Sequence, residues 1–149
     1  MKQIIIDLST VPSELFIEED TEIFATFDGN GEDNLKTKVN FVHAKPNLTS
    51  RILIKAVLKD SARFDFEGVL KILKGASNTD TYLKIDCLIV SNKAYARAIP
   101  SLEITENEVK GGHGATIGYI DQDQMYYLMS KGLSRESAEK EIVNAFLGN

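Results

Sequence analysis

The sequence predicts a mainly β protein that ends in two short α-helices, and three observations carry this prediction. Apolar and polar residues alternate from Leu15 to Ser91, which is typical of strands with one buried and one solvated face. Three successive segments within this range repeat the same binary pattern. After residue 118 the apolar spacing changes to that of amphipathic helices. The pattern alone leaves a sandwich, a barrel and a solenoid open as architectures.

The alternation is clearest between residues 51 and 90, and residues 21–27 and 34–42 have the same character. Gly68 interrupts one of these segments and indicates a bend or a close backbone approach. Apolar side chains at every second position are expected to form the core, and these are Ile52, Ile54, Ala56, Leu58, Phe64, Phe66, Leu70, Ile72, Leu83, Ile85, Cys87 and Ile89.

Helical spacing begins near the C-terminus. Asp121 can accept hydrogen bonds from the free N–H groups at the start of one helix, and Gly132 suits the position that ends it. Ser134 is the expected N-cap of a second helix, with Glu136 in its first turn. Because isolated helices this short are marginal in water, their apolar faces have to rest on the last β layer or on another protein.

Composition limits the class of protein. A chain of 149 residues with 43% apolar residues can bury one substantial core, so we expect a single domain. The net charge of −5 argues against nucleic acid or an anionic membrane as a partner. No apolar run is long enough for a signal peptide or a membrane span, and the single cysteine fits a reducing compartment. We therefore expect a soluble, cytoplasmic protein.

The segment KGGHGATIG, residues 110–118, packs four glycines around one histidine. We expect a flexible loop here, with Gly111, Gly112 and Gly114 beside His113. This loop would divide the chain into a β core at residues 1–110 and a loop with a helical segment at residues 111–149. It does not match a phosphate-binding loop, because no lysine followed by serine or threonine ends it.

Five short motifs occur in a fixed order along the second half of the chain. They are VHAKPNLTSR (42–51), AVLKDSARFDFEG (56–68), DTYLKIDCLIVSNKA (80–94), IPSLEI (99–104) and HGATIG followed by MYYLMSKGLS. Their order and spacing resemble the C-terminal part of the SufB/SufD family, the scaffold proteins of the SUF iron–sulfur cluster assembly system. The resemblance covers the chain from about residue 40 to its end.

The resemblance implies a right-handed parallel β-helix followed by a helical segment. In that family the β-helix pairs two SufB/SufD-type subunits, and the C-terminal helices dock the ABC ATPase SufC. The implied partners are therefore a SufC-type ATPase and either a SufB/SufD-type subunit or a second copy of this chain, with dimer contacts on the strands around residues 82–104. The candidate ATPase contacts at matching positions are Met125, Tyr126, Leu128, Ile142 and Phe146.

Three side chains are candidate iron or cluster ligands. The resemblance implies that His113 ligates a transient cluster or iron at the subunit interface, whereas the residue pattern alone favours a histidine that fixes the strand-to-helix turn. His43 shares a face with apolar neighbours, as a satisfied core histidine would. Cys87 alternates with apolar residues and is expected in a dry core, where a thiol is unreactive. Since clusters usually need several thiolate or imidazole ligands, we expect none stably bound.

The chain also departs from the family pattern. The usual form of the glycine motif carries a cysteine at the position of Gly111, and His113 alone is retained. HGAT resembles the SufD branch more than the SufB branch. Positions that usually carry glutamine or asparagine inside the β-helix are Leu83, Ile85 and Cys87 in this chain. Members of the family are also much longer, so the chain resembles a miniature SufD-like protein or a C-terminal domain.

Two hypotheses follow for function. One is a non-enzymatic SufD-like scaffold or accessory protein in cluster assembly. The alternative is a divergent SufD-like structural or protein-binding module without cluster chemistry, since the motif cysteine is missing and the interior is apolar. A third hypothesis is metal-assisted hydrolysis at His113 with the carboxylates of Glu103, Glu106 and Glu108. The sequence does not support it, because no neighbouring residue is expected to raise the pKa of one of these carboxyl groups.

Overall fold

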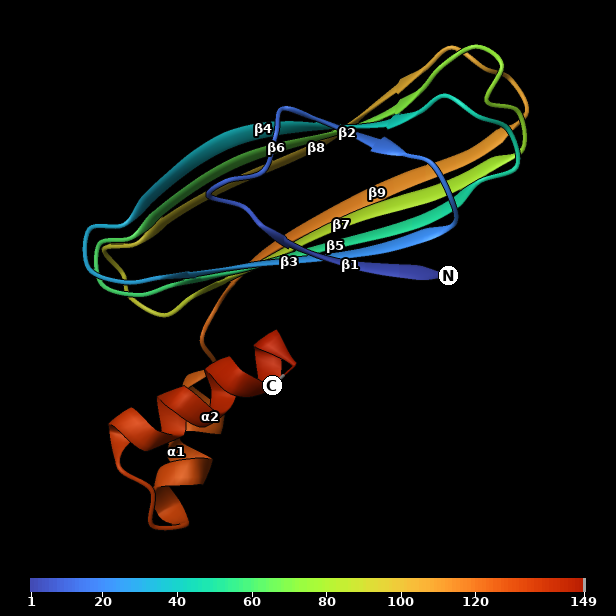
Figure 1. Ribbon diagram of the computed structural model, residues 1–149. Helices are drawn as coiled ribbons and strands as arrows, with labels where there is room; N and C mark the ends of the chain where they lie inside the picture. The colour runs from blue at the N-terminus through green and yellow to red at the C-terminus, as the bar shows by residue number, and fades with distance from the viewer. Residues whose placement is uncertain (149) are drawn as a thin grey trace.

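The computed structural model describes residues 1–148 and shows a β-solenoid followed by two helices (Figure 1). Strands alternate along the chain between two parallel sheets, so each coil adds one strand to each sheet. Sheet A contains β1 (Lys2–Asp7), β3 (Thr21–Gly29), β5 (Thr49–Leu58), β7 (Thr79–Ile89) and β9 (Val109–Tyr119). Sheet B contains β2 (Glu14–Ile17), β4 (Asn34–His43), β6 (Arg63–Ile72) and β8 (Tyr95–Ile104). The predicted β-helix is therefore confirmed, and the sandwich and barrel alternatives are excluded.

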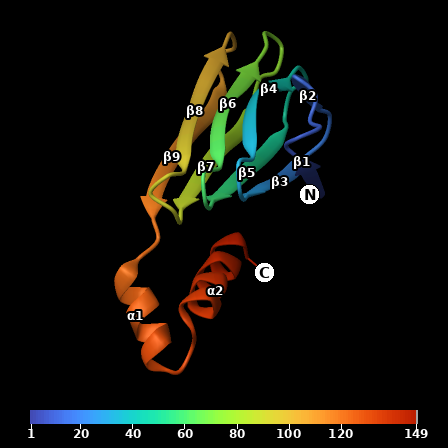
Figure 2. The same cartoon turned by 90° about the vertical axis from the view of Figure 1, so that its left-hand side faces the viewer.

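The core lies between the two sheets, which form facing layers in Figure 2. Each strand pairs in parallel with the next strand of its own sheet, without a register offset along the apolar positions, so that Ile23, Ile52 and Leu83 stack in one row. Each of these three side chains is buried. Phe64 and Phe66 stack beside this row with ring centroids 5.8 Å apart. The expected inward apolar positions of the central coils are confirmed.

Tight corners join the sheets, and they need backbone conformations that few residues adopt. Asn47, Asp60 and Asn78 have φ values of 64°, 54° and 58°, in the left-handed region where asparagine and aspartate are tolerated best among non-glycine residues. The Asn78 side-chain amide also donates to the Asn47 side-chain oxygen of the preceding coil at 3.0 Å. The corners are therefore stacked upon one another like the strands.

The segment predicted as a glycine loop is the strand β9, and this expectation was wrong. β9 pairs with β7 over its full length, from Thr79 with Val109 to Ile89 with Tyr119. Gly112 and Gly114 fit this strand because Tyr82 on β7 occupies the space in which their side chains would lie. The boundary between solenoid and helices consequently falls after Tyr119 instead of at residue 110.

Two helices follow the solenoid, α1 (Gln122–Ser130) and α2 (Arg135–Leu147). Their expected caps are confirmed, because Asp121 accepts from Asp123 N and Gln124 N, and Ser134 accepts from Ser137 N. Across residues 1–148, neither helix is long and apolar enough to cross a membrane.

The apolar faces of the helices rest on the last β layer. Val143 and Leu147 of α2 pack against Val57 and Leu88, which point away from the core on the outer face of sheet A. Leu88 also packs with residues of α1, and Figure 1 shows both helices on the side of sheet A. The sequence left open whether these apolar faces rest on the last β layer or on another protein. The structure shows that they rest on the sheet of the same chain.

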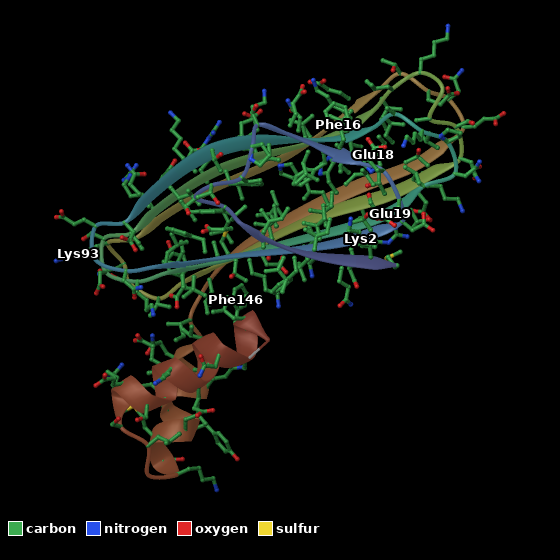
Figure 3. The ribbon with its side chains drawn as sticks, viewed as in Figure 1. Lys2, Phe16, Glu18, Glu19, Lys93 and Phe146 are labelled. Atoms are coloured by element: carbon green, nitrogen blue, oxygen red, sulfur yellow. The ribbon has the colours of Figure 1, made fainter. Side chains whose placement is uncertain are left out.

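A lysine from the sheet fastens the C-terminal end of α2. Lys55 Nζ donates to the backbone oxygen of Phe146 at 2.6 Å and lies 5.3 Å from the centre of its ring. Phe146 lies between α2 and sheet A in Figure 3. The last turn of α2 has no basic residue of its own, so Lys55 supplies the positive charge that a helix C-terminus favours.

The substitution Lys55→Met should loosen the end of α2 without unfolding the solenoid. Methionine keeps most of the apolar stem but removes the hydrogen bond and the charge, a loss of about 1 to 2 kcal/mol at a helix C-terminus. Amides of the last turn of α2 should exchange with solvent about tenfold faster by mass spectrometry, and those of β5 should not. The matched control is Lys84→Met, on the same outer face, where Lys84 forms an ion pair with Asp86 of its own strand. Equal exchange in both variants would refute the role of Lys55.

Candidate functional site

The solenoid ends in an uncovered rung formed by β8 and β9, which are the edge strands of their sheets. His113 lies in this rung opposite Leu83, a fully buried core residue. In a parallel pair both side chains point the same way, so His113 points to the interior side and is exposed because no further coil covers it. Ala115 and Ile117 are exposed for the same reason. We call these three residues with Tyr119 the open end.

Gly111 lies on the same side of β9, two residues before His113. A Cβ atom at Gly111 would meet Ile104 Cδ1 at 3.3 Å and Ile72 Cδ1 at 3.7 Å, so only flexible side-chain ends limit the space. Residues two apart on a strand project from the same face. A thiol at position 111 and the imidazole of His113 would therefore lie side by side at the open end, and this chain retains the imidazole.

Gly112 and Gly114 face outward, beneath a tyrosine. A Cβ atom at Gly112 would lie 3.0 Å from Tyr82 Cδ2, and one at Gly114 would lie 3.0 Å from the Tyr82 hydroxyl. The ring of Tyr82 thus occupies the space that larger side chains would need. The surface beside it is a shallow groove of about 590 Å³ whose lining includes Arg51 and Lys110.

His43 is fully buried and both of its ring nitrogens have partners. Nδ1 donates to the Lys71 carbonyl at 3.1 Å, which leaves Nε2 to accept from Ser50 Oγ at 2.8 Å. Ser50 Oγ lies 2.5 Å from Thr81 Oγ1. Burial lowers the pKa of His43 from its usual 6.5. The structure places His43 as a neutral core histidine, and no ring nitrogen is free for a ligand.

Cys87 is buried with its side chain in the apolar core, next to Ile54, Ile85 and other aliphatic residues of the same cluster. Burial, with a smaller contribution from the neighbouring Asp86 carboxylate, raises the pKa of the thiol to about 12. Because the thiolate is the metal-binding form, this cysteine is a poor ligand at neutral pH.

The helical candidates differ in their accessibility. Met125 is buried against Ile120 and Ala138, and Phe146 is half-buried against sheet A. Leu128 and Ile142 are half-buried and line a hollow of about 370 Å³ between α1 and α2. Tyr126 is 61% exposed, and its neighbour Tyr127 is exposed to a similar degree. The accessible part of the predicted docking surface is therefore α1 and the hollow beside it.

The acidic residues near the open end serve local structure. Glu106 accepts the backbone N–H of Gly75 at 2.9 Å, which together with the N–H of Asn107 lowers the pKa of its carboxyl. Glu103 pairs with Lys71 at 3.4 Å. Between residues 1 and 148, no three His, Cys, Asp or Glu residues come together as a metal-binding group.

The fold is a parallel β-solenoid whose last rung is uncovered and whose two helices pack on the outer face of one sheet. These features define a class of β-helical proteins with an exposed sheet edge. The description of the family that matches residues 18–146 reads "SUF system FeS cluster assembly, SufBD core domain", and the chain belongs to this family. The resemblance seen in the sequence is thus confirmed.

Individual relatives agree with this assignment. The chain is 38% identical over 119 residues to the iron-sulfur cluster assembly protein SufD of Bacillus subtilis (strain 168), covering 80% of this chain and 27% of that protein. SufD of Escherichia coli (strain K12) is 34% identical over 74% of this chain and 26% of its own length. SufB of Bacillus subtilis is 30% identical over 71% and 23%. The chain therefore spans about a quarter of the length of these relatives.

Sequence reasoning missed two features of this region. The open end was missed because the glycines were taken as a loop, although His113, Ala115 and Ile117 keep the period of two of a strand. The position of Tyr82 over Gly112 was missed because cross-strand neighbours are set by register, which the sequence does not show. The alternation within GGHGATI was the available signal.

The buried His43 predicts a specific pH dependence of stability. The pKa of His43 is lower in the folded chain than the usual 6.5. Below about pH 6.5 the unfolded chain therefore binds more protons at this position than the folded chain does. The free energy of unfolding should therefore hold above about pH 6.5 and decrease below it, by at most about 1.4 kcal/mol per pH unit. Urea unfolding between pH 7.5 and 5.5 measures this slope.

The control is His113→Gln, which changes the exposed histidine and should retain the slope. His43→Gln should remove it, whatever its effect on absolute stability. An unchanged slope in His43→Gln would contradict the assignment of this titration to the buried imidazole.

Proposed function

We propose that the chain is a non-enzymatic scaffold or accessory protein of iron–sulfur cluster assembly. The observation that carries this proposal is the family match over residues 18–146, together with an open end that retains His113. The relatives whose names state a function are iron-sulfur cluster assembly proteins. A cytoplasmic location is part of the proposal, and the free, unpaired thiol of Cys87 supports it.

Pairing through the open end is the first part of this function. The outer edge of β9 has no strand beside it in residues 1–148, and unpaired strand edges are templates for pairing with another chain. Ile117 is 45% and Tyr119 72% exposed there, which gives apolar area to bury. The partner is a SufB/SufD-type subunit or a second copy of the chain.

The iron–sulfur cluster is the cargo in this proposal, and two subunits hold it jointly. His113 offers one accessible imidazole, whereas the ring nitrogens of His43 are both engaged and the thiol of Cys87 stays protonated. Further ligands would come from the partner subunit across the open end. Binding is accordingly expected to be transient, with no resident cofactor.

Docking of a SufC-type ATPase through the helices is the second part. Exposed aromatic side chains on a folded surface are frequent anchors of protein interfaces, and Tyr126 and Tyr127 are both exposed on α1. The hollow lined by Leu128 and Ile142 lies beside them. Lys55 and sheet A hold the helices in place, so a movement of the ATPase would be transmitted to the solenoid.

The alternative is a divergent module that binds proteins but handles no cluster. Gly111 in place of the family cysteine and the apolar Leu83 and Ile85 favour it. The two functions differ in whether His113 has a chemical role.

Cluster handling is tested by anaerobic reconstitution with iron and sulfide, read by visible absorption. We expect a cluster signal that decreases in His113→Ala and increases in Gly111→Cys, because a thiol at position 111 projects beside the imidazole. The matched control is Gly118→Cys, where the glycine faces outward and a Cβ atom meets nothing within 4 Å. If the cluster signal of the parent chain does not change in His113→Ala, a ligand role of His113 is refuted. If Gly111→Cys gives no cluster signal, the alternative module without cluster chemistry is favoured.

ATPase docking is tested by co-purification with the cognate SufC-type ATPase. The double substitution Tyr126→Ala and Tyr127→Ala should weaken binding by about 2 kcal/mol or more, roughly a thirtyfold loss of affinity by calorimetry. Tyr95→Ala is the matched control, because Tyr95 is exposed on sheet B and stacks on Arg63. If the parent chain does not bind the ATPase, or if truncation before Ser134 changes nothing, docking through the helices is refuted.

A further inference from the structure

The middle of β9 lacks much of the support that β3, β5 and β7 receive. One of its edges has no strand beside it in residues 1–148, and inward side chains such as His113 and Ala115 are exposed. Glycine is also a poor strand former, because it offers no side chain for packing and loses more backbone entropy than other residues. Pairing with β7 alone would therefore leave this segment prone to local opening.

Tyr82 on β7 supplies a contact from the outer face. Tyr82 and Gly112 are register partners, and a Cβ atom at Gly112 would lie 3.0 Å from Tyr82 Cδ2 and 3.1 Å from Tyr82 Cε2. A Cβ atom at Gly114 would lie 3.0 Å from the Tyr82 hydroxyl. The tyrosine side chain thus runs along β9 from Gly112 to Gly114. Both glycines are half-buried, whereas the residue between them, His113, is exposed.

Arg51 on β5 lies on the other side of the tyrosine. It is the register partner of Tyr82 on that strand, and it forms an ion pair with Asp80 at 3.1 Å. Its guanidinium also donates to the carbonyl oxygens of Ser50 and Asp80 at 2.9 and 3.1 Å. The space on the β5 side is therefore occupied by a fixed side chain, and the ring lies over β9.

The ring, and not the backbone conformation, requires glycine at these two positions. Neither Gly112 nor Gly114 has a positive φ, so their backbone is open to residues with a side chain. The nearest obstacle to a Cβ atom at both positions is Tyr82. An aromatic residue that packs over a glycine of the neighbouring strand is a known means of stabilising an edge strand. Tyr82 and the two glycines therefore form a matched set.

We propose that Tyr82 is a positioning residue of the open end, because its side chain keeps the glycine-containing part of β9 paired with β7 and thereby holds His113 beside Leu83. Tyr82 lies on the opposite face of the sheet from His113, so it acts through the strand and not by touching a ligand. The consequence for ligand binding rests on the ligand role of His113 proposed above. The ordering of β9 does not depend on that role.

Hydrogen exchange of the full chain, read by NMR, tests the ordering. Tyr82→Ala should lower the protection of the amides from Gly111 to Ala115 about fivefold, the size expected when one cross-strand contact is lost, while β5 keeps its protection. Tyr82→Phe keeps the ring and should resemble the parent chain. Tyr95→Ala is the matched control, because it removes an exposed tyrosine from sheet B. Unchanged protection of β9 in Tyr82→Ala would overturn the proposal.

A substitution on the other strand tests whether ring and glycine form a pair. Gly112→Val alone should also lower the protection of β9, because its Cβ atom would meet the ring at 3.0 Å. Combined with Tyr82→Ala, the same valine should restore protection to within about twofold of the parent chain, since valine suits a strand and the ring is absent. Gly118→Val is the control, because a Cβ atom there meets nothing within 4 Å, and it should not rescue Tyr82→Ala. Additive losses in the Gly112 combination would contradict the proposal.

The position of His113 needs a measurement of its own. Leu83 is its register partner, and both side chains point to the interior side. Nuclear Overhauser contacts between the His113 ring and the Leu83 methyl groups should be present in the parent chain and in Tyr82→Phe. They should be lost in Tyr82→Ala and return when Gly112→Val is added. Contacts that are missing in the parent chain, or that persist in Tyr82→Ala, would show that Tyr82 does not position His113.

Cluster reconstitution separates this inference from the proposed function. In the Gly111→Cys background, Tyr82→Ala should decrease the cluster signal about tenfold, as expected when a residue that orients a ligand is lost, and Tyr82→Phe should not. A cluster signal that is unchanged in Tyr82→Ala would overturn the proposal. If Gly111→Cys binds no cluster, the ligand role of His113 is refuted, while the exchange and Overhauser measurements still decide whether Tyr82 positions the side chain.

Discussion

The in-register stacking of interior side chains from coil to coil is the constraint on which the structure depends. Because parallel strands pair without offset, Ile23, Ile52 and Leu83 form one continuous apolar row. The same register carries the polar row in which Ser50 meets Thr81, with His43 satisfied beside it. A shift by one residue would turn every inward side chain outward, so the register also fixes the corners and the face on which the helices rest.

A solenoid defined by stacking has two ends that stacking cannot satisfy. At the first end, Leu8 and Val11 pack against the core cluster. At the last end, His113 and Ile117 keep the inward positions of a rung but have nothing above them. The candidate site is thus a consequence of the architecture. An inward-facing side chain becomes accessible to a partner only in the last rung, where no further coil covers it.

In the proposed function, the helices are the elements through which an ATPase would bind. Their apolar faces are buried against Val57 and Leu88 of the sheet, and Lys55 closes the contact at the C-terminal end of α2. What remains exposed is the aromatic pair Tyr126 and Tyr127. The division is physically reasonable, because a docking module that transmits movement has to be fixed to its own solenoid on one face and free on the other.

The sequence by itself determined the strands, the inward positions, both helix caps and the core location of Cys87, because these follow from local periodicity and capping chemistry. The family and the parallel β-helix followed from ordered motifs. Only the tertiary structure decided that KGGHGATIG is a strand, since the ring that fills the space over Gly112 comes from Tyr82, about one coil earlier in the chain. It also decided that Met125 is buried and that His113 is exposed. Exposure depends on whether another coil or helix covers a residue, and that is set by the order of stacking and not by the residues nearby in sequence.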